Sequence, residues 1–384
     1  MFEEFFHLVR QWYAMPEGPV PLHVPRFAEL DRQYVMDAID STFVSSVGEY
    51  VNRFEQNLAS ILGCRYVVAT VNGTAALQVA LQLAGVRRKE DVITQSLSFV
   101  ATANAIVYNG ADPVFLDVDQ ETLGLSPDAV RMFLENHTER KNGQTFNQRT
   151  GRRIAAIVPM HTFGHPVQIH ELMNIADEWN IPLIEDAAEA IGSSFEGRAC
   201  GTFGKLGVFS FNGNKTITCG GGGAIVTDDE ELAKLAKHLT TTAKVSHHWE
   251  FVHDMVGYNY RMPNLNAALA CAQMEQLDGF LASKRELANH YANFFRGVEW
   301  AEFVTEPDCC CSNYWLNAIL LEDRRQRDAL LQASNDAGIV TRPCWTPLNE
   351  LEMYRYCTTD SLLQTRNFVD RLVNIPSSAQ WTEL

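Results

Sequence analysis

The distribution of apolar residues predicts an alternation of helices and short buried strands from about residue 55 onwards. Two helices are expected at Ala75–Leu83 and Ile169–Glu178, where apolar residues recur at helical spacing. Strands alternating with helices favour an α/β fold, in which a mostly parallel mixed sheet is covered on both faces. The predicted strands are Tyr66–Val71, Asp91–Gln95, Pro113–Val118, Ile154–Met160, Ile181–Glu185, Leu206–Phe211 and Ala224–Thr227.

The two ends of the chain depart from this alternation. Residues 1–24 are expected to form an N-terminal extension, a short amphipathic helix followed by a Pro/Gly turn. Within the alternation itself, a polar stretch, Asn136–Arg153, is expected to be an exposed hairpin or loop around Asn142-Gly143. After about residue 265 a long helical region, Leu265–Phe295, leads into a smaller α/β segment. We therefore predict a large domain over residues 25–265 and a small C-terminal domain over residues 266–384.

Composition and charge exclude several classes of protein. The formal net charge is -16, and the basic residues form no dense run, so nucleic acid is not expected as a partner. No apolar run reaches the ~18–20 residues of a membrane helix, and the acidic first residues do not resemble a secretory signal. The nine cysteines form no CxxC pairs. We expect reduced thiols in a cytoplasmic protein and predict no metal site.

The first candidate site is the turn after the strand that ends near Val71. The sequence Asn72-Gly73-Thr74 opens an Ala/Leu-rich helix, so the amides of Gly73 and Thr74 would lie at a helix N-terminus that favours an anion such as phosphate. Gly73 would also let the backbone approach a ligand closely. The alternative is an ordinary turn with a capping Asn or Thr.

The second candidate is the segment Ile181–Glu189, in which an apolar strand runs directly into carboxylates. A buried acid such as Asp186 is costly unless it meets a partner, and a pyridinium nitrogen would be one. The alternative is an acid that caps a helix, and this segment alone favours that alternative.

The third candidate is Lys215, which follows an apolar strand ending near Ser210 and precedes the four glycines Gly220–Gly223. An apolar, crowded pocket favours the neutral, nucleophilic form of an amine. The alternative is a surface lysine beside a flexible turn, so the interpretation depends on the combination of the three segments.

The combination is specific. A phosphate cradle, a strand-end carboxylate and a lysine follow one another in this order, and pyridoxal 5′-phosphate requires these three anchors for its phosphate, ring nitrogen and aldehyde. The aromatic ring of Phe99 is available to stack on the cofactor.

These segments resemble the DegT/StrS family of sugar aminotransferases, which have the pyridoxal-phosphate-dependent transferase fold type I. The resemblance runs from about Pro21 to the end of the chain. The motifs that carry it are Asn72–Leu77, Glu185–Ala188, Ser210–Lys215 and Gly257–Arg261. The chain looks similar to the bacillosamine/legionaminic-acid (LegC) branch in Val44–Gly48, Leu239–Lys244, Ser312–Asn317, Thr341–Pro343 and Asn374–Ser378.

The resemblance implies a role for each matching residue. Lys215 would bind the cofactor covalently, Asp186 would pair with the ring nitrogen, and Phe99 would stack on the ring. Glu189 would lie near the phenolic oxygen. The phosphate would be held by Gly73, Thr74 and Ser210, together with Asn259 of the neighbouring subunit. The active sites would then be shared within a homodimer.

The reaction implied is the transfer of an amino group from L-glutamate to the 4-keto group of a nucleotide-linked 6-deoxy sugar. The expected acceptor is UDP-2-acetamido-4-keto-2,6-dideoxyhexose. A departure from this branch at Arg26–Asp31 leaves a GDP- or dTDP-4-keto sugar of the perosamine type as an alternative. His161, Tyr314 and Arg342 are candidate substrate contacts. Each has a structural alternative: a satisfied histidine, a core tyrosine and a surface ion-pair partner.

The sequence also bears on three rival functions. A pyridoxal-dependent sugar dehydratase would have histidine in place of Lys215. A nicotinamide oxidoreductase is disfavoured because no GxGxxG opens a helix after the first strand. A non-catalytic regulator could retain the fold, but the intact set of anchors argues against it.

Overall fold

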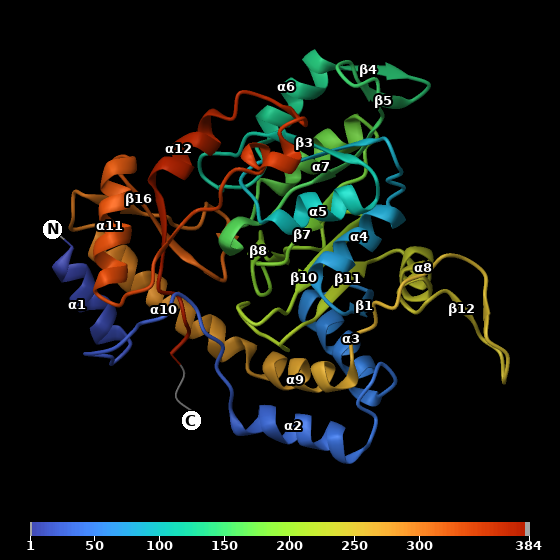
Figure 1. The fold of residues 1–384 in the computed structure, drawn as a ribbon, viewed down its shortest axis with the longest axis horizontal. Helices are drawn as coiled ribbons and strands as arrows, with labels where there is room; N and C mark the ends of the chain where they lie inside the picture. The colour runs from blue at the N-terminus through green and yellow to red at the C-terminus, as the bar shows by residue number, and fades with distance from the viewer. Residues whose placement is uncertain (1, 381–384) are drawn as a thin grey trace.

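The central feature of the computed structural model, in which residues 2–380 are described, is an eight-stranded sheet (Figure 1). One half has the order β1 (Tyr66–Thr70), β11 (Gly223–Thr227), β10 (Leu206–Ser210), β7 (Ile184–Asp186). The other half has the order β6 (Ile154–Val158), β2 (Asp91–Gln95), β3 (Asp112–Leu116), β18 (Thr358–Thr359). Parallel bridges from Ile157 to Leu183 and from Met160 to Asp186 join the two halves.

The direction of the strands confirms the predicted mixed, mostly parallel sheet. Only β11 runs antiparallel to its neighbours β1 and β10, whereas β10–β7, β2–β6, β2–β3 and β3–β18 are parallel pairs. All seven predicted strands are present, with ends that differ by up to three residues.

Helices cover both faces of the sheet, because successive strand residues point to opposite sides. Phe209 of β10 packs with α3 (Glu49–Leu62) and α9 (Asn264–Glu275), and α2 (Glu29–Asp40) lies outside these two helices. Its neighbour Val208 faces α4 (Gly73–Leu83), α5 (Val100–Tyr108) and α8 (Glu230–Thr240). The remaining helices of this part are α6 (Pro127–His137) and α7 (Ile169–Glu178).

A smaller unit contains its own antiparallel sheet. Its strands, in spatial order, are β14 (Ala301–Phe303), β16 (Asn317–Leu321), β19 (Leu372–Ile375) and β17 (Arg342–Pro343). The helices that accompany it are α10 (Leu277–Phe295), α11 (Arg324–Asp336) and α12 (Leu363–Arg371). Short 3₁₀ turns complete the chain at Thr162–Gly164, Leu348–Glu350 and Glu352–Tyr354.

The predicted N-terminal extension is built into this smaller unit. Helix α1 (Glu3–Trp12) buries Phe5, whose ring centroid lies 5.6 Å from that of Phe295 and 6.2 Å from that of Tyr291. The single long helix predicted for Leu265–Phe295 is divided at Gln276 into α9 and α10. Because α9 packs on α2 and α3, it lies with the large unit, although all but its first two residues fall in the predicted small domain. The last four residues of that predicted domain, 381–384, lie outside the described residues.

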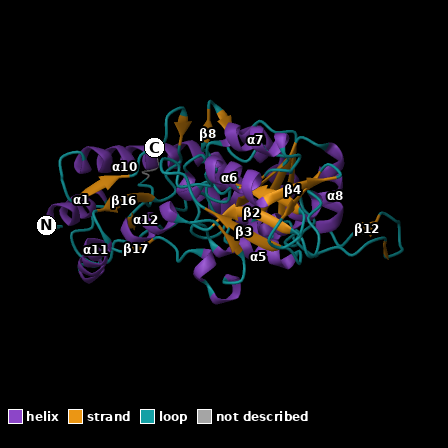
Figure 2. Cartoon of the chain, turned by 90° about the horizontal axis from the view of Figure 1, so that it is seen from above, coloured by secondary structure: helices purple, strands orange, loops and turns teal. Residues whose placement is uncertain are grey.

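Two hairpins project from the large unit. The polar stretch predicted as a hairpin forms β4 (Thr138–Lys141) and β5 (Gln144–Asn147), and both turn residues, Asn142 and Gly143, have positive φ. A second hairpin, β12 (Lys244–Val245) and β13 (Val252–His253), extends away from the body in both views (Figures 1 and 2). A three-stranded sheet is made by β8 (Ser194–Phe195), β9 (Arg198–Ala199) and β15 (Cys310–Cys311).

None of the described helices is long and apolar enough to cross a bilayer. The nine cysteines form no disulfide in the structure.

Candidate active site

The candidate site lies at one edge of the sheet, where several strands end side by side. Thr70 of β1 pairs with Gly223 of β11, and Gly223 pairs with Ser210 of β10. Asp186, the last residue of β7, pairs with Val208 of β10. Ligands of open α/β sheets bind at the carboxyl ends of strands. The carboxyl ends of β1, β10 and β7, with β11 between β1 and β10, therefore bring the predicted segments to one edge of the sheet.

The turn between β1 and α4 has the geometry of an anion cradle. The side chain of Asn72 caps α4 by accepting a hydrogen bond from the N–H of Ala75 at 2.8 Å. A Cβ atom at Gly73 would lie 2.8 Å from the Cβ of Ser210, so only glycine lets the two backbones approach this closely. Gly73 and Thr74 are the first residues of an 11-residue helix, where N–H groups and the helix dipole favour a phosphate.

The carboxylate of Asp186 is 5% exposed and is oriented by two neutral donors. Its Oδ2 atom accepts a hydrogen bond from the hydroxyl of Thr102 at 2.7 Å, and its Oδ1 atom accepts one from the N–H of Ala188 at 3.2 Å. Burial raises the pKa of this carboxyl, and the two hydrogen bonds oppose that rise. A buried acid held in this way is suited to pair with a cationic group of a ligand.

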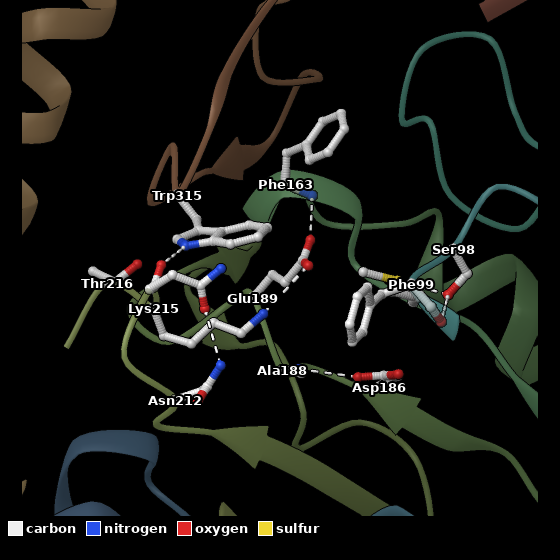
Figure 3. Close-up of polar contacts among 12 residues, drawn as sticks. Ser98, Phe99, Phe163, Asp186, Ala188, Glu189, Asn212, Lys215, Thr216 and Trp315 are labelled. Carbon is white, nitrogen blue, oxygen red and sulfur yellow. Dashed lines mark hydrogen bonds and ion pairs between the residues drawn. The ribbon is translucent and has the colours of Figure 1, made fainter. Parts of the chain in front are cut away.

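The buried carboxyl of Glu189 pairs with the partly buried amine of Lys215, whose side chain is 11% exposed (Figure 3). The Nζ atom of Lys215 lies 3.3 Å from Oε1 of Glu189 and 4.1 Å from the centre of the Trp315 ring. The other oxygen of Glu189 accepts a hydrogen bond from the N–H of Phe163 at 3.0 Å. Desolvation by burial raises the pKa of Glu189 to about 7. A carboxyl that titrates near neutrality beside an amine can exchange a proton with it.

These groups line a single cavity of about 330 Å³. Seven of the residues predicted to bind the cofactor line it together: Gly73, Thr74, Phe99, Asp186, Glu189, Ser210 and Lys215. Phe99, the N-cap residue of α5, lines the cavity and remains 49% exposed, so its ring is available for stacking.

Asn259 does not line this cavity within one chain. It is exposed, and its backbone forms an isolated bridge with Thr241 at the base of the β12–β13 hairpin. A contribution of Asn259 to the phosphate site therefore requires a second copy of the chain.

The three candidate substrate contacts lie outside the cavity lining. His161 is fully buried, with Nε2 3.0 Å from Oε2 of Glu185 and Nδ1 accepting the N–H of Val167 at 3.2 Å. This environment is that of a satisfied structural histidine. Both ring nitrogens have protein partners, so none is left for a substrate.

Tyr314 and Arg342 also make structural contacts. Tyr314 is buried, and its hydroxyl oxygen accepts a hydrogen bond from the N–H of Glu306 at 3.1 Å. Arg342 is exposed on β17 and donates to the side chain of Asn335 at 3.0 Å and to the carbonyl oxygen of Thr341 at 2.8 Å. Tyr314 thus matches its core alternative, whereas Arg342 is a surface residue whose two hydrogen-bond acceptors are neutral groups rather than an ion-pair partner.

Sequence analysis missed several residues of the site. Trp315 and Trp345 line the cavity, and the Nε1–H of Trp315 donates to the carbonyl oxygen of Asn214 at 2.6 Å, next to Lys215. The amide of Asn313 donates to the carbonyl oxygen of Glu189 at 2.8 Å. Asn313 and Trp315 lie in Ser312–Asn317, a segment that carried the resemblance, but neither had a predicted role. They are about a hundred positions from the segments they contact, so no local pattern indicated that they belong to the site.

Pyridoxal phosphate fits these residues. Because Gly73 has no Cβ, space remains beside the Ser210 hydroxyl and the first amides of α4. This combination of donors suits a phosphate. Asp186, whose two hydrogen bonds come from neutral donors, suits a protonated ring nitrogen. The amine of Lys215 reaches the same cavity and suits the aldehyde.

Comparison with known proteins identifies the family. A model of the DegT/DnrJ/EryC1/StrS aminotransferase family matches residues 25–383. The chain is 35% identical over 335 residues to a GDP-perosamine synthase of Escherichia coli O157:H7, covering 87% of each protein. It is 33% identical to a GDP-perosamine synthase of Vibrio cholerae, covering 93% of this chain and 94% of the relative. Among solved structures, the aminotransferase TlmJ from Streptoalloteichus hindustanus superposes with a TM-score of 0.85 at 29% identity over 94% of each chain.

These matches confirm the predicted fold type I, the predicted aminotransferase class and the predicted cofactor, pyridoxal phosphate. The chain belongs to the DegT/DnrJ/EryC1/StrS aminotransferase family.

Proposed function

We propose that this protein transfers an amino group from L-glutamate to the 4-keto group of a nucleotide-linked 6-deoxy sugar, with pyridoxal phosphate as cofactor. The observation that carries the proposal is the single cavity in which the α4 cradle, Asp186 and Lys215 meet. Membership of a sugar aminotransferase family supports the reaction class.

When bound, the cofactor supplies an electron sink that weakens the bonds of the carbon bearing the amino group. Gly73, Thr74 and Ser210 would hold its phosphate, and Phe99 would cover one face of its ring. Asp186 would face the ring nitrogen and Lys215 the aldehyde.

The residues of the chain move and hold protons. The amine of Lys215 would act as the base that takes a proton from the α-carbon of the amino donor and as the acid that returns it. The carboxyl of Glu189, 3.3 Å from Nζ, is placed to share that proton, and its raised pKa lets it be protonated or ionised near neutral pH. The rings of Trp315 and Trp345 line the cavity, and these apolar surfaces would restrict water there.

The acceptor is the finer part of the proposal. The segments similar to the LegC branch favour UDP-2-acetamido-4-keto-2,6-dideoxyhexose, whose product would be the UDP-4-amino sugar of bacillosamine- and legionaminic-type surface glycans. The relatives from Escherichia coli and Vibrio cholerae are GDP-perosamine synthases, and they favour a GDP-4-keto sugar instead. Both acceptors carry the same reacting ketone, so one assay distinguishes them.

The decisive experiment supplies L-glutamate and, in separate reactions, UDP-, GDP- and dTDP-linked 4-keto sugars. We expect 2-oxoglutarate and a 4-amino sugar nucleotide in equal amounts with one class of nucleotide. Loss of a hydroxyl without incorporation of nitrogen would identify a dehydratase and overturn the proposal. A Lys215→Ala protein is the control, since it retains the cavity without the amine.

We also propose that the functional unit is a homodimer with shared sites. The β12–β13 hairpin exposes Trp249 (77%), Phe251 (79%) and, just beyond it, Val256 (86%). Apolar side chains this exposed on a projecting hairpin are typical of a contact surface. The hairpin leads back to Asn259, which would thereby reach the cavity of the neighbouring subunit.

Mixing two inactive variants tests the shared site. Lys215→Ala and Asn259→Ala each impair every site of their own dimers. After unfolding and reassociation in equal amounts, half of the dimers are mixed, and each mixed dimer has one intact site, so about a quarter of native activity should return. Sites contained within one chain would show no recovery.

A further inference from the structure

The hydrogen bond from Thr102 to Asp186 is one link in a buried chain of side chains. The hydroxyl of Thr102 lies 2.7 Å from Oδ2 of Asp186, and the hydroxyl of Ser98 lies 3.0 Å from that of Thr102. All three side chains are buried. Water therefore does not compete for these groups.

The hydroxyl protons available determine which group donates in each of these hydrogen bonds. An ionised carboxylate only accepts hydrogen bonds, so the single proton of the Thr102 hydroxyl must point to Asp186. The oxygen of Thr102 is then free to accept the proton of Ser98. The other acceptors near Ser98 are the sulfur of Met160 at 2.9 Å and the carbonyl oxygen of Phe99 at 3.4 Å. A thioether sulfur is a weak acceptor, which favours the direction from Ser98 through Thr102 to Asp186.

The same helical turn carries a second contact of the cavity. Phe99 is the N-cap residue of α5, and Thr102 follows three positions later, with its N–H bonded to the carbonyl oxygen of Phe99 at 3.2 Å. Figure 3 shows Ser98 and Phe99 beside Asp186, whose other oxygen receives the N–H of Ala188. One helical turn thus positions both the ring of Phe99 and the carboxylate of Asp186.

We propose that Thr102 is a positioning residue that fixes the plane of the Asp186 carboxylate and keeps it ionised toward the cavity, and that Ser98 supports it. This inference rests on the proposed function only in that Asp186 faces the ring nitrogen of pyridoxal phosphate. Burial alone disfavours the charged carboxylate, and a hydroxyl donor stabilises it. The other titratable groups around Asp186 are Lys215, Glu189 and His161.

Three variants separate this role from simple packing. Thr102→Val keeps the shape of the side chain and removes the donor, Thr102→Ser keeps the donor and removes a methyl group, and Ser98→Ala removes the supporting hydroxyl. The measurement is the dissociation constant of pyridoxal phosphate, determined by absorbance and fluorescence titration between pH 5 and 9. Circular dichroism confirms that each variant is folded.

We expect Thr102→Val to weaken cofactor binding about 10-fold or more at neutral pH, the effect of losing a hydrogen bond to a charged group. The pH below which affinity declines should also move upward by about one unit, because the acid then ionises less readily. Thr102→Ser should restore both properties, and Ser98→Ala should show a smaller shift in the same direction.

The proposal would be overturned if Thr102→Val bound pyridoxal phosphate with native affinity and if that affinity declined at the same pH as in the native protein. It would also be overturned if Thr102→Val and Thr102→Ser lost the same affinity for the cofactor at every pH, since that result indicates packing alone. The proposed function fails separately, if the native protein binds pyridoxal phosphate but aminates none of the sugar nucleotides. A native protein that does not bind the cofactor would overturn both.

Discussion

The amine of Lys215 lies 3.3 Å from Oε1 of Glu189, and Oε2 of the same carboxyl is held by the N–H of Phe163. Phe163 adopts a φ of 57°, a left-handed conformation that is unusual for an aromatic residue. Its N–H nevertheless points at the carboxyl, so local backbone strain coincides with the orientation of Glu189 at the reacting end of the cavity.

Replacement of Lys215 gives the most direct test of the chemistry. Lys215→Ala should lower the rate of amino transfer by about 10²–10⁴-fold, because it removes the amine that moves the proton. In the native protein, borohydride reduction followed by peptide mass spectrometry should place the pyridoxyl group on Lys215. Native rates in Lys215→Ala, or a label on another side chain, would contradict the assignment.

The raised pKa of Glu189 predicts a pH-dependent contribution to stability. Burial raises this pKa from an ordinary 4.5 to about 7. Between these values the folded protein retains a proton that the unfolded chain has released. The group therefore stabilises the fold fully below pH 4.5 and loses that contribution as pH rises to about 7.

Glu189→Gln cannot ionise and should remove this contribution, which is at most about 3 kcal/mol at about 1.36 kcal/mol per pH unit. The measurement is the free energy of unfolding of the cofactor-free native and variant proteins in urea at pH 5 and pH 7.5. The variant should gain relative stability at the higher pH. A difference between the two proteins that is the same at both pH values would argue against a titrating Glu189.

The close approach of Gly73 and Ser210 predicts a selective loss of cofactor binding. In Gly73→Ala the added Cβ would lie 2.8 Å from the Cβ of Ser210, so the turn must shift and the first amides of α4 with it. The affinity for pyridoxal phosphate should fall about 10-fold or more, given a cost of ~1–3 kcal/mol for overpacking. Gly297→Ala is the matched control, since its nearest neighbour would be a carbonyl oxygen at 3.5 Å. Equal losses in both variants would exclude a specific cradle.

The burial of His161 predicts a structural rather than a substrate-binding role. His161→Asn removes a donor from the buried Glu185, which also accepts the N–H groups of Gly201, Phe203 and Gly204. We expect a loss of about 1–3 kcal/mol in the free energy of unfolding, with unchanged KM for the sugar nucleotide. Urea unfolding and steady-state kinetics test this. A tenfold higher KM at native stability would restore His161 as a substrate contact.

Much of the fold follows from local sequence patterns. The strands β1, β2 and β10 were predicted with nearly the same ends, because short apolar runs bounded by turn residues need no distant partner to be recognised. The hairpin at Asn142-Gly143 was predicted for the same reason, since this dipeptide favours positive φ. Gly73, Asp186 and Lys215 were predicted as candidates because each lies at a strand end or within five residues after one, and parallel strands end at a common edge.

Other features depended on contacts between distant parts of the chain. Trp315 touches Lys215, Thr102 orients Asp186, and α1 joins the hydrophobic cluster of α10, and each pair lies 84 or more residues apart in sequence. A sequence pattern reports which face of an element is apolar, but not which element covers it.

The sequence by itself determined the alternation of strands and helices, the three candidate cofactor-binding segments and their order, because each is encoded within a few consecutive residues. Only the tertiary structure decided that His161 is enclosed by Glu185 and Val167, and that Glu189 meets the amine of Lys215. The physical reason is that burial, and with it the pKa and accessibility of a side chain, is set by everything packed around it rather than by its neighbours in the chain.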